Sequence, residues 1–171
     1  MAVLEILHYP DERLSRKCEP VPEITPELIK LADDMVETMY DAPGVGLAAP
    51  QVGVLQRLVV IDCAPSDEAA DLITAFNPEI VERDGECFEE EGCLSVPGYA
   101  AKVHRAARVK VRYQDRDGAM VEREADGLLA VAFQHEIDHL DGILYVDRLS
   151  SLKRGMFRKK YQKMLAQSEP S

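Results

Sequence analysis

Two histidines four residues apart, His135 and His139, are the residues whose types and spacing point most clearly to chemistry. On an α-helix, residues at this spacing share one face, so both imidazoles can reach a single metal ion. Glu136 follows the first histidine, where a carboxylate can take a proton from a water whose pKa the metal has lowered to about 7. Residues 135–139 therefore predict a metal-dependent hydrolytic site. The alternative is a surface helix that happens to carry two histidines.

The segment around this motif favours the metal site over the surface helix. We expect a helix over 127–140, and the stretch 128–133 within it is apolar on all sides, which is typical of a helix buried in the middle of a protein. Gly142 provides the stop signal. Two histidines at the end of a buried helix need polar partners, and a metal ion supplies one for each.

A catalytic metal site needs a third protein ligand in addition to the two histidines. No histidine follows His139, and the acids downstream of it are poorly placed or near the end of the chain. The better candidates are two upstream cysteines, Cys87 and Cys93, and spacing alone does not choose between them. A thiolate ligand would favour iron(II), nickel or zinc. The alternative for either cysteine is a small buried hydrophobic residue.

The glycine-rich segment 44–51, which we expect to be a loop, is a second candidate for chemistry. It lacks the lysine of a phosphate-binding P-loop, and its Gly-x-Gly pattern lacks the third glycine of a dinucleotide site. Its tip carries no charge and ends in Gln51, so backbone and amide N–H groups there could hold a substrate carbonyl. An ordinary turn between a helix and a strand is the alternative.

The remaining elements indicate an α+β fold with antiparallel sheets packed around the central buried helix. Thr25-Pro26 opens a helix that ends over 41–44, because threonine caps and proline suits the first turn. The other expected elements are a strand over 58–61, a second strand over 72–81 that bends at Asn77-Pro78, a hairpin over 108–113 and 120–125, and a basic amphipathic helix over 151–167.

Length and composition indicate one soluble catalytic domain over 1–171, with a basic helix and tail over 151–171. Hydrophobic residues make up 46% and charged residues 30%, which is typical of globular proteins. No apolar run approaches the roughly 20 residues that cross a bilayer. Residues 1–14 resemble neither a signal nor a transit peptide, so we expect a cytoplasmic protein with no membrane partner. The four cysteines lack Cys-x-x-Cys spacing and are expected to be core thiols or ligands.

The formal net charge of −11 argues against extensive nucleic-acid binding, but the charge is uneven. Six cations and no acid lie between Lys153 and Lys163. This basic face is either a contact surface for an anionic partner or a solvated face of the helix.

Three segments together resemble the signature motifs of the peptide deformylase family. They are Gly-Val-Gly-Leu-Ala-Ala-Pro-Gln at 44–51, Glu-Gly-Cys-Leu-Ser at 91–95 and Gln-His-Glu-Ile-Asp-His-Leu-Asp-Gly at 134–142. Their order and spacing match the family, and the resemblance extends from residues 7–11 to 147–150. It implies removal of the formyl group from N-terminal formyl-methionine of nascent polypeptides.

The resemblance also implies a role for particular residues. Cys93, rather than Cys87, would bind the metal with His135 and His139, and Glu136 would be the general acid and base. The side chain of Gln51 and the backbone N–H of Leu94 would stabilise the oxyanion. The family's metal is iron(II), with nickel, cobalt or zinc as substitutes in purified protein. Candidates for the substrate-binding wall are Gly44, Val45, Gly46, Glu91, Val131 and Ala132.

The resemblance further predicts a monomer that contacts the ribosome through the basic C-terminal helix. Two other functions fit the histidine motif alone. A zinc-dependent endopeptidase uses the same pentapeptide. A metal-stabilised binding module would hold the metal without catalysis.

Overall fold

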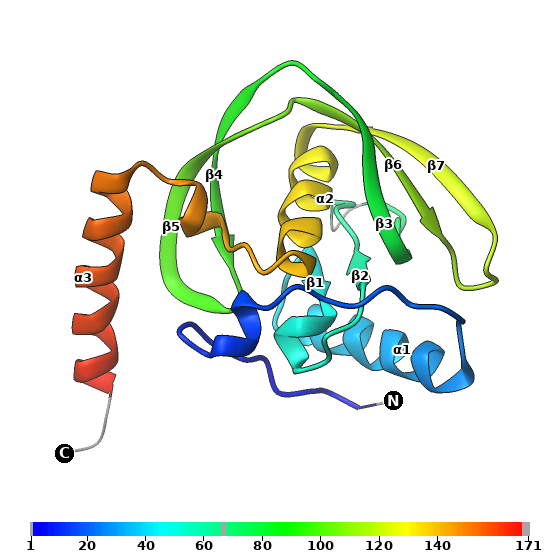
Figure 1. Cartoon of the computed structure of the whole chain (residues 1–171), viewed down its shortest axis with the longest axis horizontal. Helices are drawn as coiled ribbons and strands as arrows, with labels where there is room; N and C mark the ends of the chain where they lie inside the picture. The colour runs from blue at the N-terminus through cyan, green and yellow to red at the C-terminus, as the bar shows by residue number, and fades with distance from the viewer. Residues whose placement is uncertain (1, 66–67, 169–171) are drawn as a thin grey trace.

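The computed structural model describes residues 2–65 and 68–168. Its principal elements are α1 (Pro26–Asp41), β1 (Gly46–Ala48), β2 (Leu58–Ile61), β3 (Ile73–Asp84), β4 (Cys87–Cys93), β5 (Val96–Arg105), β6 (Arg108–Gln114), β7 (Met120–Asp126), α2 (Gly127–Leu140) and α3 (Ser151–Ser168). Three short 3-10 helices accompany them, η1 (Glu12–Ser15), η2 (Ala49–Val52) and η3 (Tyr145–Arg148). In Figure 1, α2 runs through the centre, and α3 lies at the edge beyond β5.

A five-stranded antiparallel sheet in the order β1-β2-β3-β6-β7 supports α2. Strand β2 reads Leu-Val-Val-Ile without alternation because both of its faces are covered. Val59 and Ile61 pack in the cluster that contains α2, whereas Leu58 and Val60 pack in the cluster that contains α1. The sheet is therefore sandwiched at this edge between the two helices.

Strand β3 is long and bends where its pairing with β6 shifts register, between Phe76 and Glu79. Asn77 adopts a φ of 51° there, a conformation that asparagine tolerates better than most residues. Its side chain accepts from Val21 N–H at 2.7 Å and donates to Val21 O at 2.8 Å. The bend predicted at 77–78 is thus a β-bulge stabilised by its own side chain.

Strands β4 and β5 form a separate two-stranded sheet on the other side of α2 (Figure 1). Its inner face packs in a third cluster with η3 and α3, in which Val103, Tyr145 and Phe157 are buried. The sequence pattern does not predict strands over 87–105, because charged residues dominate β4 and interrupt the two-residue hydrophobic period.

The C-terminal end of α2 is fixed by backbone hydrogen bonds. Gly142 N–H donates to His139 O and Ile143 N–H to Asp138 O, at 3.1 and 2.9 Å. This is a Schellman motif, and Gly142 adopts the required left-handed φ of 77°. A Cβ atom at residue 142 would lie 2.5 Å from Ser15 O. The predicted stop at Gly142 therefore also brings η1 against the end of the helix that carries the histidines.

The α+β fold with antiparallel sheets is confirmed, as are the helices predicted from Thr25-Pro26, over 127–140 and over 151–167. The strand expected over 72–81 runs from 73 to 84 instead. The loop interpretation of 44–51 was partly wrong, because residues 46–48 pair with β2 and 49–52 form a 3-10 turn. Part of the predicted C-terminal tail, 169–171, lies outside the described residues. None of the described helices is long and apolar enough to span a membrane.

Candidate metal centre and catalytic cleft

Cys93, His135 and His139 converge although they come from different elements. Cys93 ends β4, and the two histidines lie on the last two turns of α2. One potential ligand atom from each of the three lies within 4.8 Å of the others. The Sγ atom of Cys93 is 3.3 Å from His139 Nε2. A thiolate with two buried imidazoles is a donor set that suits a divalent transition metal.

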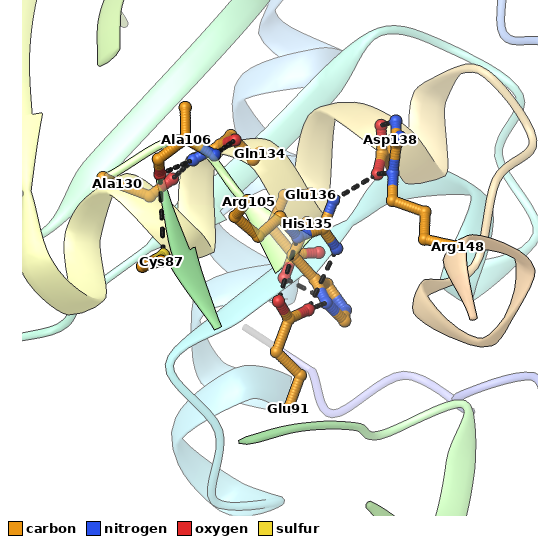
Figure 2. Close-up of polar contacts among 10 residues, drawn as sticks. All are labelled: Cys87, Glu91, Arg105, Ala106, Ala130, Gln134, His135, Glu136, Asp138 and Arg148. Carbon is orange, nitrogen blue, oxygen red and sulfur yellow. Dashed lines mark hydrogen bonds and ion pairs between the residues drawn. The ribbon is translucent and has the colours of Figure 1, made fainter. Parts of the chain in front are cut away.

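Cys87, the other cysteine that spacing left open, lies elsewhere. It occupies the opposite end of β4, and its thiol donates to the carbonyl of Ala106 at 3.7 Å (Figure 2). The geometry therefore separates the two cysteines and brings only Cys93 to the histidines.

His135 is oriented by a carboxylate on the side away from the metal centre. Its Nδ1 lies 3.0 Å from Glu91 Oε1, so a proton on Nδ1 is donated to Glu91 and Nε2 is left as the ligand atom. Glu91 in turn accepts from Nε and Nη2 of Arg105, both at 2.9 Å. By contrast, Nδ1 of His139 is buried and has no hydrogen-bond partner among the described residues.

The charges behind His135 continue across α2, as Figure 2 shows. Nη1 of Arg105 donates to Asp138 Oδ2 at 2.5 Å. Arg148 of η3 donates to both oxygens of the same carboxylate, at 2.5 and 2.7 Å. Two buried carboxylates, Glu91 and Asp138, are thereby matched by two guanidinium groups. We refer to Glu91, Arg105, Asp138 and Arg148 as the charged cluster.

Glu136 lies on the cleft side of α2 and is 5% exposed. Its Oε2 is 4.0 Å from His135 Nε2, and its Oε1 is buried with no hydrogen-bond partner among the described residues. Burial raises the pKa of Glu136 to about 7, and the nearby negative charge of Glu91 adds to that effect while His135 opposes it. A carboxyl group with a pKa in this range can both accept and release a proton.

Gly46 explains how Glu136 fits. A Cβ atom at residue 46 would lie 2.6 Å from Glu136 Oε2, so any larger residue would displace the carboxylate. A second glycine, Gly44, lies close to Leu94, and a Cβ atom at residue 44 would be 2.9 Å from Leu94 Cδ1. The glycines of segment 44–51 thus let this segment approach both the carboxylate and the Cys93 loop.

The two histidines respond oppositely to their surroundings. Burial lowers the pKa of His139 well below its usual value, and the adjacent His135 adds to the effect. Burial alone would also lower the pKa of His135, but Glu136, Cys93 and Glu91 outweigh it and raise that pKa well above the usual value. Of the two imidazoles, only that of His135 has a carboxylate partner, the Glu91 oxygen 3.0 Å from its Nδ1.

Gln51 lies in η2 with its carboxamide against the metal centre and is 1% exposed. Its Oε1 accepts from Ala48 N–H at 2.9 Å. Its Nε2 donates to Ser95 Oγ at 3.0 Å and lies 3.6 Å from Cys93 Sγ. An N–H donor beside the metal ligands is well placed to stabilise a developing negative charge.

A cleft of about 740 Å³ opens beside these groups. All of the predicted wall residues line it, Gly44, Val45, Gly46, Glu91, Val131 and Ala132. The carboxylate of Glu91, however, is hydrogen-bonded to Arg105 and His135. It therefore orients the imidazole of His135 and does not form an apolar part of the cleft wall. Leu128, Pro97 and Tyr99 also line the cleft, and the sequence motifs do not predict them.

Comparison with known proteins decides the family. A sequence model of the family described as polypeptide deformylase matches residues 3–155. The peptide deformylase of Thermodesulfovibrio yellowstonii is 56% identical over 162 residues, which cover 95% of this chain and 98% of that protein. A peptide deformylase structure from Legionella pneumophila has a TM-score of 0.90 and 50% identity, covering 99% of this chain and 100% of that one. The chain belongs to the polypeptide deformylase family.

A third relative carries a ligand. The structure of the Ehrlichia chaffeensis peptide deformylase in complex with actinonin has a TM-score of 0.90 and 40% identity, covering 96% of this chain and 98% of that one. The chain is accordingly an enzyme whose family removes formyl groups from nascent peptides. The two alternatives that the histidine motif allowed, a zinc endopeptidase and a binding module without catalysis, find no support in these deformylase relatives.

Within this deformylase architecture, several buried polar residues escaped sequence reasoning. Arg105, Asp138 and Ser95 are all buried and make side-chain hydrogen bonds around the metal centre or Gln51. Asp138 lies inside the histidine motif, which could have drawn attention to it. Arg105 had no such signal, because its partners Glu91 and Asp138 are 14 and 33 residues away along the chain.

Proposed function

We propose that this enzyme deformylates N-terminal formyl-methionine with a metal held by Cys93, His135 and His139, and that the metal in the cell is iron(II). The observation that carries the proposal is the convergence of these three donors within 4.8 Å beside the unpartnered carboxylate oxygen of Glu136. A divalent metal held there supplies a Lewis acid and lowers the pKa of a coordinated water. One thiolate and two imidazoles accept iron(II), nickel, cobalt or zinc.

Glu136 carries the proton in this mechanism. Its Oε1 is buried and without a protein partner, so it can accept a proton from the attacking water and then protonate the leaving amine. A pKa of about 7 allows both transfers near neutral pH. Gly46 leaves the space that this carboxylate occupies.

The oxyanion that forms on the formyl group is stabilised by two donors of this chain. Nε2 of Gln51 points toward Cys93, and the backbone N–H of Leu94 follows directly after that ligand. Fixed donors of this type typically provide the largest catalytic contribution, about 10²–10³-fold for one donor.

The methionine side chain of the substrate is bound by the cleft walls, with Val45, Val131 and Ala132 as apolar contacts. Discrimination between formyl and acetyl groups depends on one methyl group, which a tight site rejects by about 1–3 kcal/mol. Actinonin, which is bound in the Ehrlichia chaffeensis relative, should compete with formyl-methionine peptides for this cleft.

The setting of the reaction follows from its substrate. We infer a cytoplasmic monomer, with 1–171 as one catalytic domain, that contacts the ribosome through α3. Five of the six cations between 153 and 163 are exposed, and none of the six forms an ion pair with an acid in the described part of the chain. Unpaired cations on a chain of net charge −11 suit a phosphate-rich partner such as ribosomal RNA.

A comparison of two cysteine variants, Cys93→Ala and its control Cys87→Ala, tests the proposed metal centre. The proteins are purified without oxygen, their metal content is measured, and turnover is compared on formyl-methionine and acetyl-methionine peptides. Cys93→Ala should lose the metal and nearly all turnover, whereas Cys87→Ala should keep both. Retention of metal and activity by Cys93→Ala would refute the proposed centre. Cleavage of internal peptide bonds by the native enzyme would indicate a protease instead.

A further inference from the structure

The buried hydroxyl of Ser95 contacts the carboxamide of Gln51 directly. Ser95 is 0% exposed, and its Oγ accepts from Gln51 Nε2 at 3.0 Å. Ser95 is two residues beyond Cys93, in the turn between β4 and β5, while Gln51 is 44 residues earlier in the chain. The hydrogen bond thus joins the segment that carries the proposed oxyanion donor to the segment that carries the thiolate.

The orientation of the Gln51 carboxamide is determined by its two neighbours. The backbone N–H of Ala48 can only donate, so the carboxamide atom 2.9 Å from it must be the oxygen. Nε2 therefore faces the metal centre. One of its two hydrogens is held by Ser95 Oγ, and the other is directed to the region of Cys93 Sγ, 3.6 Å away. Without Ser95, the carboxamide would keep only the Ala48 hydrogen bond and the longer contact to Cys93 Sγ.

The backbones of Gln51 and Ser95 are also held by a shared segment. The N–H of Leu7 donates to the carbonyl of Gln51, and the N–H of Tyr9 donates to the carbonyl of Ser95, each at 2.7 Å. One short stretch of the N-terminal segment therefore sets the separation between the two backbones, and the side-chain hydrogen bond acts across that fixed separation.

From these contacts we infer that Ser95 is a positioning residue for deformylation, which holds Nε2 of Gln51 in the orientation that stabilises the oxyanion. This inference rests on the proposed role of Gln51. Ser95 touches no reacting atom, so its effect must pass through the carboxamide. The interaction should matter in the transition state, where charge develops, and little when the substrate binds.

A double-mutant cycle measures this dependence with the metal-loaded enzyme. Gln51→Ala should lower kcat about 10²–10³-fold. Ser95→Ala should lower kcat about tenfold, the rate equivalent of one hydrogen bond, with KM and metal content unchanged. In the Gln51→Ala background, Ser95→Ala should change kcat less than about twofold, because residues that act as a unit are not additive. Thr74→Val removes another buried hydroxyl, at a residue of β3 that does not line the cleft, and should leave kcat unchanged.

The outcomes separate the inference from the proposed function. If Gln51→Ala has full activity, the oxyanion role of Gln51 and the inference both fail. If Gln51→Ala is impaired but Ser95→Ala is harmless, or if the two losses multiply, only the inference fails. A spectroscopic measurement is independent of turnover. In the zinc-loaded enzyme, the side-chain amide protons of Gln51 should exchange with solvent faster in Ser95→Ala than in the unsubstituted protein, and equal exchange rates would overturn the inference.

Discussion

Helices α2 and α3 show how differently two helices of one chain can be used. Of the 14 residues of α2, the 11 from Ala130 to Leu140 are buried, whereas α3 buries Phe157 and Tyr161 and leaves Leu152 and Met156 exposed at 76% and 61%. In Figure 1, α2 is surrounded by strands, and α3 touches the molecule along one side. Burial on all sides gives α2 desolvated polar groups whose chemistry is altered by their surroundings. The exposed charges of α3 remain solvated. Their available role is to attract a partner of opposite charge.

The largest expected effect follows from removing the carboxylate of α2 that we propose as the proton carrier. Glu136→Gln preserves size and shape beside Gly46 but cannot accept a proton from water. We expect turnover on formyl-methionine peptides to fall about 10²–10⁴-fold, with metal content unchanged because the three ligands remain. The reverse exchange at an exposed position of α3, Gln162→Glu, should leave kcat unchanged. A Glu136→Gln enzyme with native turnover would show that this carboxylate is not the catalytic acid and base.

The second effect concerns the charged cluster behind α2. Arg105 has a side chain that is 3% exposed and neutralises Glu91 and Asp138. Arg105→Met should lower the free energy of unfolding by about 3–5 kcal/mol, because it leaves the buried carboxylate of Glu91 without its guanidinium partner, although Asp138 keeps Arg148. It should also weaken metal binding about 10–100-fold, since Glu91 then orients His135 less firmly.

An exposed ion pair provides the matched control for Arg105. Arg112 on β6 pairs with Glu122 at 2.7 Å, and both side chains are nearly half exposed. Arg112→Met should change the free energy of unfolding by less than about 1 kcal/mol. Urea unfolding monitored by circular dichroism measures both variants. Equal losses in the two variants would mean that burial does not distinguish the charged cluster from a surface pair.

The third effect tests how α3 is attached. Phe157 is 2% exposed and packs against Tyr9, Tyr99 and Tyr161, with ring centroids 4.8–5.4 Å away. Phe157→Ala should release α3 locally instead of unfolding the protein, because the aromatic contacts of α3 are confined to this one face. Trypsin should then cleave at the basic residues of α3 at least several-fold faster, while Leu152→Ala, at an exposed position of the same helix, should not alter cleavage. Unchanged cleavage in Phe157→Ala would show that other contacts dock the helix.

The same contrast explains what could be predicted from sequence. Local signals sufficed for α1 and α2, since a Thr-Pro start, a continuous apolar run and Gly142 specify helix ends without knowledge of the fold. The histidine motif could be recognised because its geometry is contained in a single turn of helix. The family resemblance then supplied Cys93 and Gln51, which spacing alone left open or only suggested.

What could not be predicted depends on contacts between distant segments. The charge-rich β4 pairs with β5, and its buried Glu91 is neutralised by Arg105 on that strand. No local pattern predicts this pairing. Likewise, the hydrogen bond between Ser95 and Gln51 exists only because η2 lies beside the turn between β4 and β5. The short β1 was taken for a loop because its three residues include Gly46, and its pairing with β2 is again a tertiary contact.

The smallest expected effect on catalysis comes from removing positive charges of α3. The same variant tests whether α3 is a docking surface. Lys159→Gln combined with Lys163→Gln removes two exposed cations and preserves Phe157 and Tyr161, which truncating the helix would not. Turnover on short formyl-methionine peptides should be unchanged, because neither lysine lines the cleft.

Affinity for ribosomes, measured by co-sedimentation at several salt concentrations, should fall and become less salt-dependent, as each lost phosphate contact reduces counterion release. As a control, the exposed and uncharged Gln162 and Gln167 of the same helix are exchanged for alanine. This variant changes the surface of α3 without removing a charge, so the affinity should not change. If the double lysine variant sedimented with ribosomes as the unsubstituted enzyme does, the cations of α3 would simply be a solvated face.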